Sequence, residues 1–581
     1  MFARFARFSR FSGFSRFAEF ARLAGFARLA ACVAAVTAVG VAGQQPAPAD
    51  LVVVNGRVFT GAGSPRQEAV AVRGSQIVAV GTRSSIEALK GPSTNVVDAE
   101  GAALLPGFND SHVHFLSGAQ SLQELDLGGA RTLEEVLQKI REFAAANPGA
   151  PWIRGRGWNY GAFPDGLPTR AQLDRALPDR PAVLVCFDGH SSWVNSRALQ
   201  AARIDSSTAD PPNGAITRIE NTREPDGLLK ESAQGLVRKV MPEPSRAEKR
   251  RAIAAGIELA HSIGVTSIQN ASGNDDEFAV YEEARAAGEL PLRVYSSLSV
   301  SPGFTEADAD RFDAIRRRIA NDDRFKAGAV KLLVDGVIET NTAVMLAPYV
   351  NNPATKGVPN YPAPELDRIV RMLDARGWQI FVHAIGDGGV RMTLDAFERA
   401  AKANPPPARG RRHRVEHIET IDLADVPRFG ALGVIASMQP PHTRLMNSPN
   451  PRGQWAGNNG PERQARGWMW KDIRERGGRL AFGSDWPVAS LNPLTGIWIG
   501  LNRIGHGSVA SQRLSLDEMI DGYTAGAAYA AFDEDRKGRL APGQLADIVV
   551  LTRDIFAAPP TAADDVQVRV TIFDGRVVYR R

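Results

Sequence analysis

Two histidines separated by one residue follow an apolar segment, and they give the strongest chemical signal in the chain. The segment runs Leu105-Pro-Gly-Phe-Asn-Asp-Ser-His112-Val-His114. Alternate side chains of an extended strand share a face, so both imidazoles can point the same way and bind one metal ion. The chain has only nine histidines, so this spacing is unusual by chance. The alternative is two polar residues at the start of a loop.

Further candidate ligands occur later in the chain, each directly after an apolar run. One histidine pair leaves a divalent ion with too few ligands, so other strands must supply the rest. The chain offers two histidines and a carboxylate in such positions, namely His383, His417 and Asp485. We therefore expect these residues to converge on one metal site.

Residues so far apart in sequence need a fold that brings strand ends together. From Ala102 onward, apolar strands alternate with helical stretches, which is typical of a parallel sheet with crossover helices. Candidate strands end near Phe108, Gln269, Leu298, Val334, Val382, His417, Met438 and Gly483. Eight such strands predict an α/β fold, the (β/α)8 TIM-type barrel, whose functional groups lie at the carboxyl ends of the strands.

Short β-rich runs separated by glycine turns occur near both ends of the chain, the first of them after an N-terminal leader of residues 1–43. Those in residues 50–104 predict a small antiparallel sheet, and residues 540–581 repeat the style. We expect both segments to form one small β-sandwich domain beside the barrel of residues 105–539. The interval from about 117 to 257 is too long for one crossover, so it predicts a subdomain inserted over the barrel mouth.

The basic charge of the chain lies in its leader. The formal net charge of 581 residues is +5, and residues 1 to 28 contain six arginines and one glutamate. The rest of the chain is therefore nearly neutral, and no nucleic-acid partner is indicated. An uncharged apolar run then extends to residue 43, so we interpret residues 1–43 as a signal peptide for export to the periplasm or beyond. The run is shorter than a membrane span, and an uncleaved leader that anchors the chain is the alternative.

Several motifs together resemble the amidohydrolase superfamily, specifically its amidohydrolase-3 branch of YtcJ-like and N-substituted formamide deformylase-like enzymes. The resemblance covers nearly the whole chain after the leader, through PGFNDSHVHF, GVTSIQN, VKLLVDGVIE, FVHAIGDGGV, RVEHIE, SMQP, GSDWPV and GRLAPGQLADIVVL. It implies a barrel that binds one or two divalent metal ions, for which Zn²⁺ is the expected ion.

The resemblance also assigns roles to single residues. His112 and His114 match ligands of the more buried metal, and His383 and His417 match ligands of the second. Asp485 matches an aspartate that binds metal and acts as the general base on the attacking water.

Lys331 and four pocket candidates complete the predicted site. Lys331 matches the position of a carboxylated lysine that bridges two metals. Because a plain ammonium would be repelled by the ions, the alternative is a lysine that points elsewhere. The residues that could contact substrate are His190, Trp158, Gln439 and Trp486, each with a packing role as the alternative. His413 lies nearer the start of its strand, so we expect it to be buried away from the mouth.

These residues together predict a hydrolase that cleaves a C–N bond, other than a peptide bond, in a small amide or N-acyl compound by metal-activated hydroxide. One alternative is another reaction on the same site, namely ester, lactone or cyclic-amide hydrolysis or deamination, because the fold does not fix the chemistry. The other is a barrel that has lost catalysis and acts in binding or regulation. The expected partner is a small molecule, no stable membrane span is expected, and a homo-oligomer stays open.

Overall fold

The computed structural model describes residues 47–164, 166–187, 189, 191–212, 214–445, 454–503, 509–562 and 564–581. The predicted signal peptide of residues 1–43 and the pocket candidate His190 lie outside the described residues. Among the helices that are described, none is long and apolar enough to cross a membrane.

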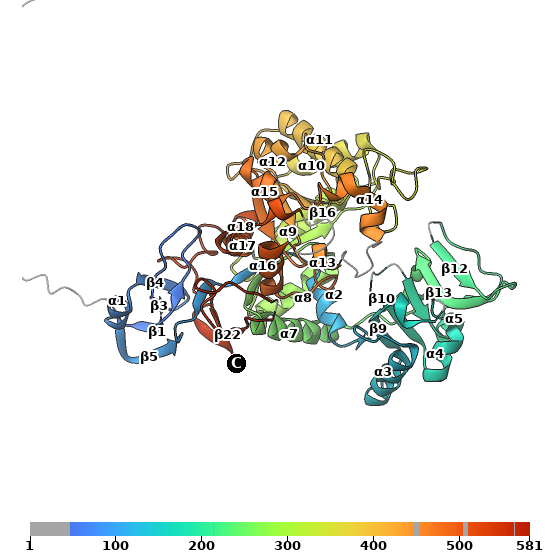
Figure 1. Ribbon diagram of the computed structural model, residues 1–581, viewed down its shortest axis with the longest axis horizontal. Helices are drawn as coiled ribbons and strands as arrows, with labels where there is room; N and C mark the ends of the chain where they lie inside the picture. The colour runs from blue at the N-terminus through green and yellow to red at the C-terminus, as the bar shows by residue number, and fades with distance from the viewer. Residues whose placement is uncertain are drawn as a thin grey trace, which may run out of the picture. The chain divides into compact units, whose positions relative to one another are not determined.

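Eight parallel strands, of which Figure 1 labels β16, form the central sheet, and their order in space follows their order in the chain. They are β7 (Phe108–Val113), β14 (Val265–Asn270), β15 (Arg293–Ser299), β16 (Phe325–Leu333), β17 (Gln379–Ala384), β18 (Arg414–His417), β19 (Ile435–Met438) and β20 (Arg479–Phe482). The backbone N–H of Asp485 donates to the carbonyl of His112 at 2.7 Å, which joins the end of β20 to β7. The predicted TIM-type barrel is confirmed.

Amphipathic helices connect the strands of the barrel. In α10 (Ala363–Ala375), Leu366, Ile369, Val370 and Leu373 are buried, a spacing that places them on one helical face. The other helices of the barrel region are α7 (Arg246–Ser262), α8 (Asp275–Ala286), α9 (Glu306–Arg318), α11 (Asp387–Ala403), α12 (Val426–Leu432), α14 (Gln454–Gln464), α15 (Trp470–Glu475), α16 (Pro493–Asn502), α17 (Leu516–Tyr523) and α18 (Ala525–Ala530). Several of them, including α7, α11 and α15, pack on strands of the parallel sheet and so cover its apolar outer face, as such sheets require.

The first barrel strand differs from the prediction in where it begins. It starts at Phe108, where we expected it to end, and runs to Val113. Leu105 belongs to the separate strand β6 (Ala103–Pro106), and Gly107 divides the two. A Cβ atom at Gly107 would lie 2.2 Å from the Thr266 side chain, so only glycine fits this close approach. His112 therefore lies within the strand.

Strands from both chain ends form two further sheets that share one hydrophobic cluster. One sheet has the order β4 (Gln76–Gly81), β3 (Ala69–Arg73), β1 (Ala49–Val54), β5 (Lys90–Asp98). The other has the order β2 (Arg57–Val58), β6, β21 (Ile548–Leu551), β22 (Val568–Phe573), β23 (Arg576–Arg580). The expectation of a purely antiparallel first sheet was wrong, because β5 runs parallel to β1 after the crossover helix α1 (Arg83–Glu87).

A six-stranded sheet with its own helices is inserted between β7 and β14. Its strands lie in the order β12 (Gly214–Arg218), β13 (Pro225–Glu231), β11 (Ser191–Val194), β10 (Ala182–Cys186), β9 (Ile153–Trp158), β8 (Leu125–Asp126). Its helices are α3 (Leu133–Ala146), α4 (Arg170–Ala176), α5 (Ser196–Ala202) and α6 (Gln234–Arg238). The guanidinium of Arg156 donates to the carbonyl of Pro487 at 2.8 Å, so the inserted sheet contacts the loop after β20.

Candidate metal centre

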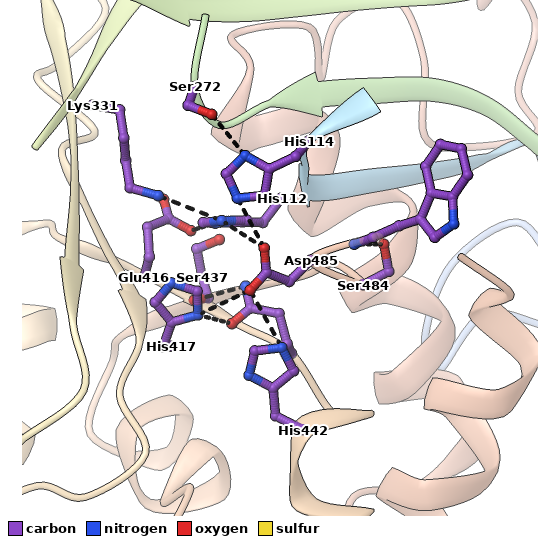
Figure 2. A network of polar contacts seen from close by, with 12 residues as sticks. His112, His114, Ser272, Lys331, Glu416, His417, Ser437, His442, Ser484 and Asp485 are labelled. Atoms are coloured by element: carbon purple, nitrogen blue, oxygen red, sulfur yellow. Dashed lines mark hydrogen bonds and ion pairs between the residues drawn. The ribbon is translucent and has the colours of Figure 1, made fainter. Parts of the chain in front are cut away.

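The predicted ligands come together at the carboxyl ends of the barrel strands. Figure 2 labels all of them except His383. The Nε2 atoms of His112 and His114 lie 3.4 and 3.1 Å from Oδ1 of Asp485. The ring of His417 lies with its centroid 4.8 Å from that of His112 and 4.5 Å from that of His383. One ligand atom from each of His112, His417 and Asp485 lies within 4.8 Å of the other two, which is a spacing that one metal ion can bridge.

Unusual backbone angles at two strand ends help to direct these side chains inward. The φ angle is +75° at His417, +51° at Ile418 and +61° at Asp485. Residues other than glycine rarely adopt this left-handed conformation, and a β-branched isoleucine does so at particular cost. Such strain persists where the surrounding structure enforces it, and it is common at functional sites.

Hydrogen bonds to the Nδ1 atom orient three of the histidines. The Nδ1 atoms of His112, His114 and His417 lie 2.6, 2.7 and 2.9 Å from Glu416 Oε2, Ser272 Oγ and Gln439 Oε1, respectively. A carboxylate or amide oxygen only accepts, so Nδ1 of His112 and of His417 carries the hydrogen. Their Nε2 atoms are then free to bind a metal, as in other histidine-rich metal sites.

His383 presents its other nitrogen to the centre. Its Nε2 atom donates to the carbonyl of Gly336 at 3.1 Å, and this bond leaves the lone pair on Nδ1. The side chain of His383 is largely buried, and its ring faces that of His417 edge-on. The structure thus brings His383 to the same centre as the other predicted ligands.

Lys331 also reaches the centre from β16. Its Nζ atom lies 3.4 Å from Nε2 of His112, and the side chain is buried (Figure 2). Burial lowers the pKa of Lys331, while the carboxylates of Glu416 and Asp485 raise it. In the structure, Lys331 therefore points toward the predicted ligands and not away from them.

Two ionised carboxylates, Glu416 and Asp485, are buried at the centre, and the first is paired with Arg414. Burial raises the pKa of Glu416, but Arg414, whose Nε donates to it at 2.7 Å, and His112 hold that pKa far below its usual range. Burial likewise raises the pKa of Asp485, but His112 and His114 hold it well below its ordinary value. Both groups stay ionised at neutral pH. Because Arg414 neutralises Glu416, the charge that favours a bound cation is that of Asp485.

The donor set fits a divalent metal ion. Oδ1 of Asp485 is buried and accepts no hydrogen bond from the described residues. The bonds on the Nδ1 atoms of His112 and His417 leave the Nε2 lone pairs of both rings available to an ion. Neutral imidazole and carboxylate ligands are those that Zn²⁺ prefers, and a cation there would satisfy the buried oxygen.

The described pocket candidates have packing or orienting positions. Trp158 is fully buried in the inserted subdomain, where its indole N–H donates to the carbonyl of Leu184 at 2.7 Å. Trp486 is 7% exposed and packs closely against Gly118 of α2 (Phe115–Ser121). Gln439 orients His417 rather than lining open space. None of these three therefore presents a large surface to a substrate in this structure.

The sequence interpretation missed four polar residues around the centre, namely Ser272, Glu416, Glu419 and His442. For Glu416 the sequence held a usable signal. In β18, the charged residues Arg414 and Glu416 alternate with Val415 within a buried strand. Buried charges need partners, so this alternation indicates a polar interior. No comparable pattern surrounds Ser272 or His442, whose roles depend on which loops meet.

This fold and this donor set define a metal-dependent hydrolase on a (β/α)8 barrel. A family model described as amidohydrolase family matches residues 95–579. The chain is 31% identical over 549 residues to the Arabidopsis thaliana protein LONG AFTER FAR-RED 3, covering 91% of this chain and 92% of that one. It is also 31% identical over 536 residues to YtcJ of Bacillus subtilis, which is named as an amidohydrolase, covering 89% and 96%. The chain belongs to the amidohydrolase family.

A more distant relative has a name that states a reaction. The N-substituted formamide deformylase of Arthrobacter pascens is 25% identical over 552 residues, covering 92% of this chain and 98% of the relative. The crystal structure of an uncharacterised metal-dependent hydrolase from Pyrococcus furiosus shares the fold, with a TM-score of 0.70, 24% identity, and coverage of 86% of this chain and 98% of that one.

Proposed function

We propose that this protein hydrolyses a C–N bond, other than a peptide bond, in a small amide or N-acyl compound. The observation that carries the proposal is the buried, ionised Asp485, whose Oδ1 atom lies within 3.4 Å of the Nε2 atoms of His112 and His114. A carboxylate held beside metal ligands can both bind the ion and move a proton. The similarity to an N-substituted formamide deformylase supports an amide-type substrate.

One or two divalent ions, with Zn²⁺ as the first choice, would be held by His112, His114, Lys331, His383, His417 and Asp485. A bound ion of this kind lowers the pKa of water and polarises a carbonyl oxygen. Gln439 and Glu416 fix two of the imidazoles, so the ligand nitrogens need little rearrangement.

Lys331 is proposed as a carbamate that bridges two ions. Its Nζ atom is buried beside His112, where a plain ammonium would compete with a cation for the same carboxylates. Burial favours the uncharged amine, which is the form that reacts with CO₂. Carboxylation would convert a repelled group into a ligand.

Asp485 is proposed as the general base and acid of the reaction. It would accept a proton from the attacking water and donate it to the leaving nitrogen. Because an amide nitrogen is a poor leaving group without a proton, both transfers are needed for C–N cleavage. Its buried position excludes bulk water from competing for that proton.

The test is a hydrolysis screen of formamides, N-acyl amino acids, esters and lactones with Zn²⁺-loaded protein. We expect turnover of at least one amide. We expect Asp485→Asn to abolish turnover even at a Zn²⁺ concentration that compensates for its weaker metal binding. Asp374→Asn is the matched control, because Asp374 is a buried aspartate hydrogen-bonded to His413 rather than to the centre. Turnover of esters or lactones alone, or release of ammonia from an amino-substituted ring, would assign another reaction to the site. Retained activity in Asp485→Asn would refute the assigned base.

A further inference from the structure

His442 lies between two carboxylates at the edge of the metal centre. It begins the short helix α13 (His442–Leu445) after β19, and its side chain is buried. Its Nε2 atom lies 3.4 Å from Oδ2 of Asp485 (Figure 2), and its Nδ1 atom lies 3.4 Å from Oε1 of Glu419. The imidazole therefore connects Glu419 to the ligand Asp485.

The two oxygens of Asp485 face different partners. Oδ1 faces the Nε2 atoms of His112 and His114 at 3.4 and 3.1 Å. Oδ2 faces His442 at 3.4 Å and, more distantly, Nδ1 of His417 at 3.9 Å. A carboxylate with one oxygen toward the ligands needs a second contact to fix its rotation, and His442 is placed to give it.

Other contacts hold His442 and Glu419 in place. The Trp455 indole N–H donates to Oε2 of Glu419 at 2.9 Å, which leaves Oε1 directed to His442. The ring of His442 stacks on that of His417, with centroids 5.7 Å apart and planes 7° from parallel. The stacked ring of His417 and the Trp455 contact to Glu419 therefore limit how His442 and Glu419 can move.

The polar atoms of this group are buried and lack hydrogen bonds of normal length. Both nitrogens of His442, Oε1 of Glu419 and Oδ1 of Asp485 have no hydrogen-bond partner among the described residues. Leaving such atoms unsatisfied is costly. A contact of 3.4 Å needs only a small rotation to become a hydrogen bond, and catalytic contacts commonly tighten when a site is filled.

We propose that His442 is a positioning residue of the metal centre. Glu419 holds its imidazole, and the imidazole holds Oδ2 of Asp485 so that Oδ1 stays directed at the ligand cluster. Groups that hydrogen-bond to a metal-binding carboxylate typically raise metal affinity or activity by about 10- to 100-fold. The inference rests on the metal centre of the proposed function, and it adds two residues to it.

The test is Zn²⁺ affinity, measured by competition with a chromogenic chelator. We expect His442→Leu to weaken Zn²⁺ binding by about 10- to 100-fold and His442→Gln to weaken it less, because the amide keeps a donor. Glu419→Gln should weaken binding too. The double variant His442→Leu/Glu419→Gln should be no weaker than His442→Leu alone, since Glu419 acts through the imidazole.

The matched control is His413→Leu. His413 is a buried histidine of the same barrel that is hydrogen-bonded to Asp374, so its loss should lower stability without changing Zn²⁺ affinity. If His442→Leu does not fold, His442→Gln and Glu419→Gln carry the comparison.

Two failures can be told apart. Zn²⁺ affinity of the folded His442 variants within twofold of wild type would overturn the inference, whether or not the protein hydrolyses amides. Weakened binding in those variants, with no amide hydrolysed by wild type, would support the positioning role and refute the proposed function. A wild-type chain that cannot bind Zn²⁺ would overturn both.

Discussion

The Oε2 atom of Glu416 lies 2.6 Å from Nδ1 of His112, and both side chains are fully buried. Glu416 also accepts from Arg414 through its other oxygen at 2.7 Å, and the Arg414 guanidinium lies over the ring of Phe381. Arg414 and Glu416 therefore form a buried ion pair that contacts His112, a proposed metal ligand. Because the Glu416 carboxylate accepts the hydrogen on Nδ1 of His112, Nε2 is the nitrogen that faces the centre.

Glu416→Leu should destabilise the protein by about 3–5 kcal/mol, because it leaves the buried Arg414 without its carboxylate. It should also weaken Zn²⁺ binding, because His112 loses its orienting bond. Urea denaturation and chelator competition measure the two effects. Glu462→Leu is the control, since Glu462 is 92% exposed and should change stability by at most about 0.5 kcal/mol. A loss of stability for Glu416→Leu as small as that of the control would contradict the predicted role of Glu416.

Lys331→Met should reduce the bound metal from two ions per chain to one, because the proposed bridging carbamate is lost. Elemental analysis of protein reconstituted with Zn²⁺ measures the ratio. Wild-type protein loaded in ¹³C-bicarbonate should show a carbamate carbon signal that the variant lacks. Equal metal content in the two proteins, together with no carbamate signal, would mean that Lys331 is a plain buried lysine.

Trp158→Ala should damage the inserted subdomain rather than substrate binding. The side chain is fully buried among Tyr160, Phe163 and the rest of its cluster, and loss of a buried tryptophan costs about 3–5 kcal/mol. We expect faster proteolysis and hydrogen exchange in β9 and β10, with KM for the best amide little changed in the intact protein. A large rise in KM with unchanged exchange would restore Trp158 as a pocket residue.

Asp374 should make stability depend on pH in the acid range. Burial raises its pKa, but hydrogen bonds from His413 and Asn404 and the neighbouring Arg411 hold the pKa at about 2, below the ordinary 3.8. A pKa depressed in the folded state contributes stability above the unfolded value, and this stability is lost as pH falls from about 4 through 2. The difference corresponds to about 2 kcal/mol.

Asp374→Asn should therefore be less stable than wild type by about 2 kcal/mol at pH 7, and the gap should narrow below pH 4. Urea denaturation at pH 7, 5 and 3.5 measures it. A gap that stays constant over this range would show that the carboxylate charge contributes nothing.

Metal removal should lower thermal stability, because a ligand that binds only the folded state stabilises it. Zn²⁺ at about 100 times its Kd would contribute about 2.7 kcal/mol. We expect a chelator to lower the melting temperature and Zn²⁺ to restore it. Asp485→Asn should show a smaller shift than wild type, whereas Asp374→Asn should show the wild-type shift.

The sequence was enough to predict the barrel and most of the candidate ligands at its mouth, because both depend on local patterns. An apolar strand that ends in a polar residue predicts a functional group at the barrel mouth, wherever that strand lies in the chain. His383, His417 and Asp485 follow this rule, and His112 and His114 follow from their alternate spacing in an extended chain. Lys331 was expected only from the resemblance to the amidohydrolase superfamily. The structure gathers all six. The direction of β5 was not predictable, because it depends on the path of α1 rather than on strand pattern.

Only the tertiary structure decided how the ligands are oriented. Glu416, Gln439 and His442 come from positions with no ligand spacing, and each acts through a contact with a residue on another strand or loop. Such contacts depend on ring rotation and on distances of about 3 Å, which periodicity does not encode. The sequence therefore determined which residues could bind a metal, and the packing of strand ends decided which nitrogen or oxygen of each one faces it.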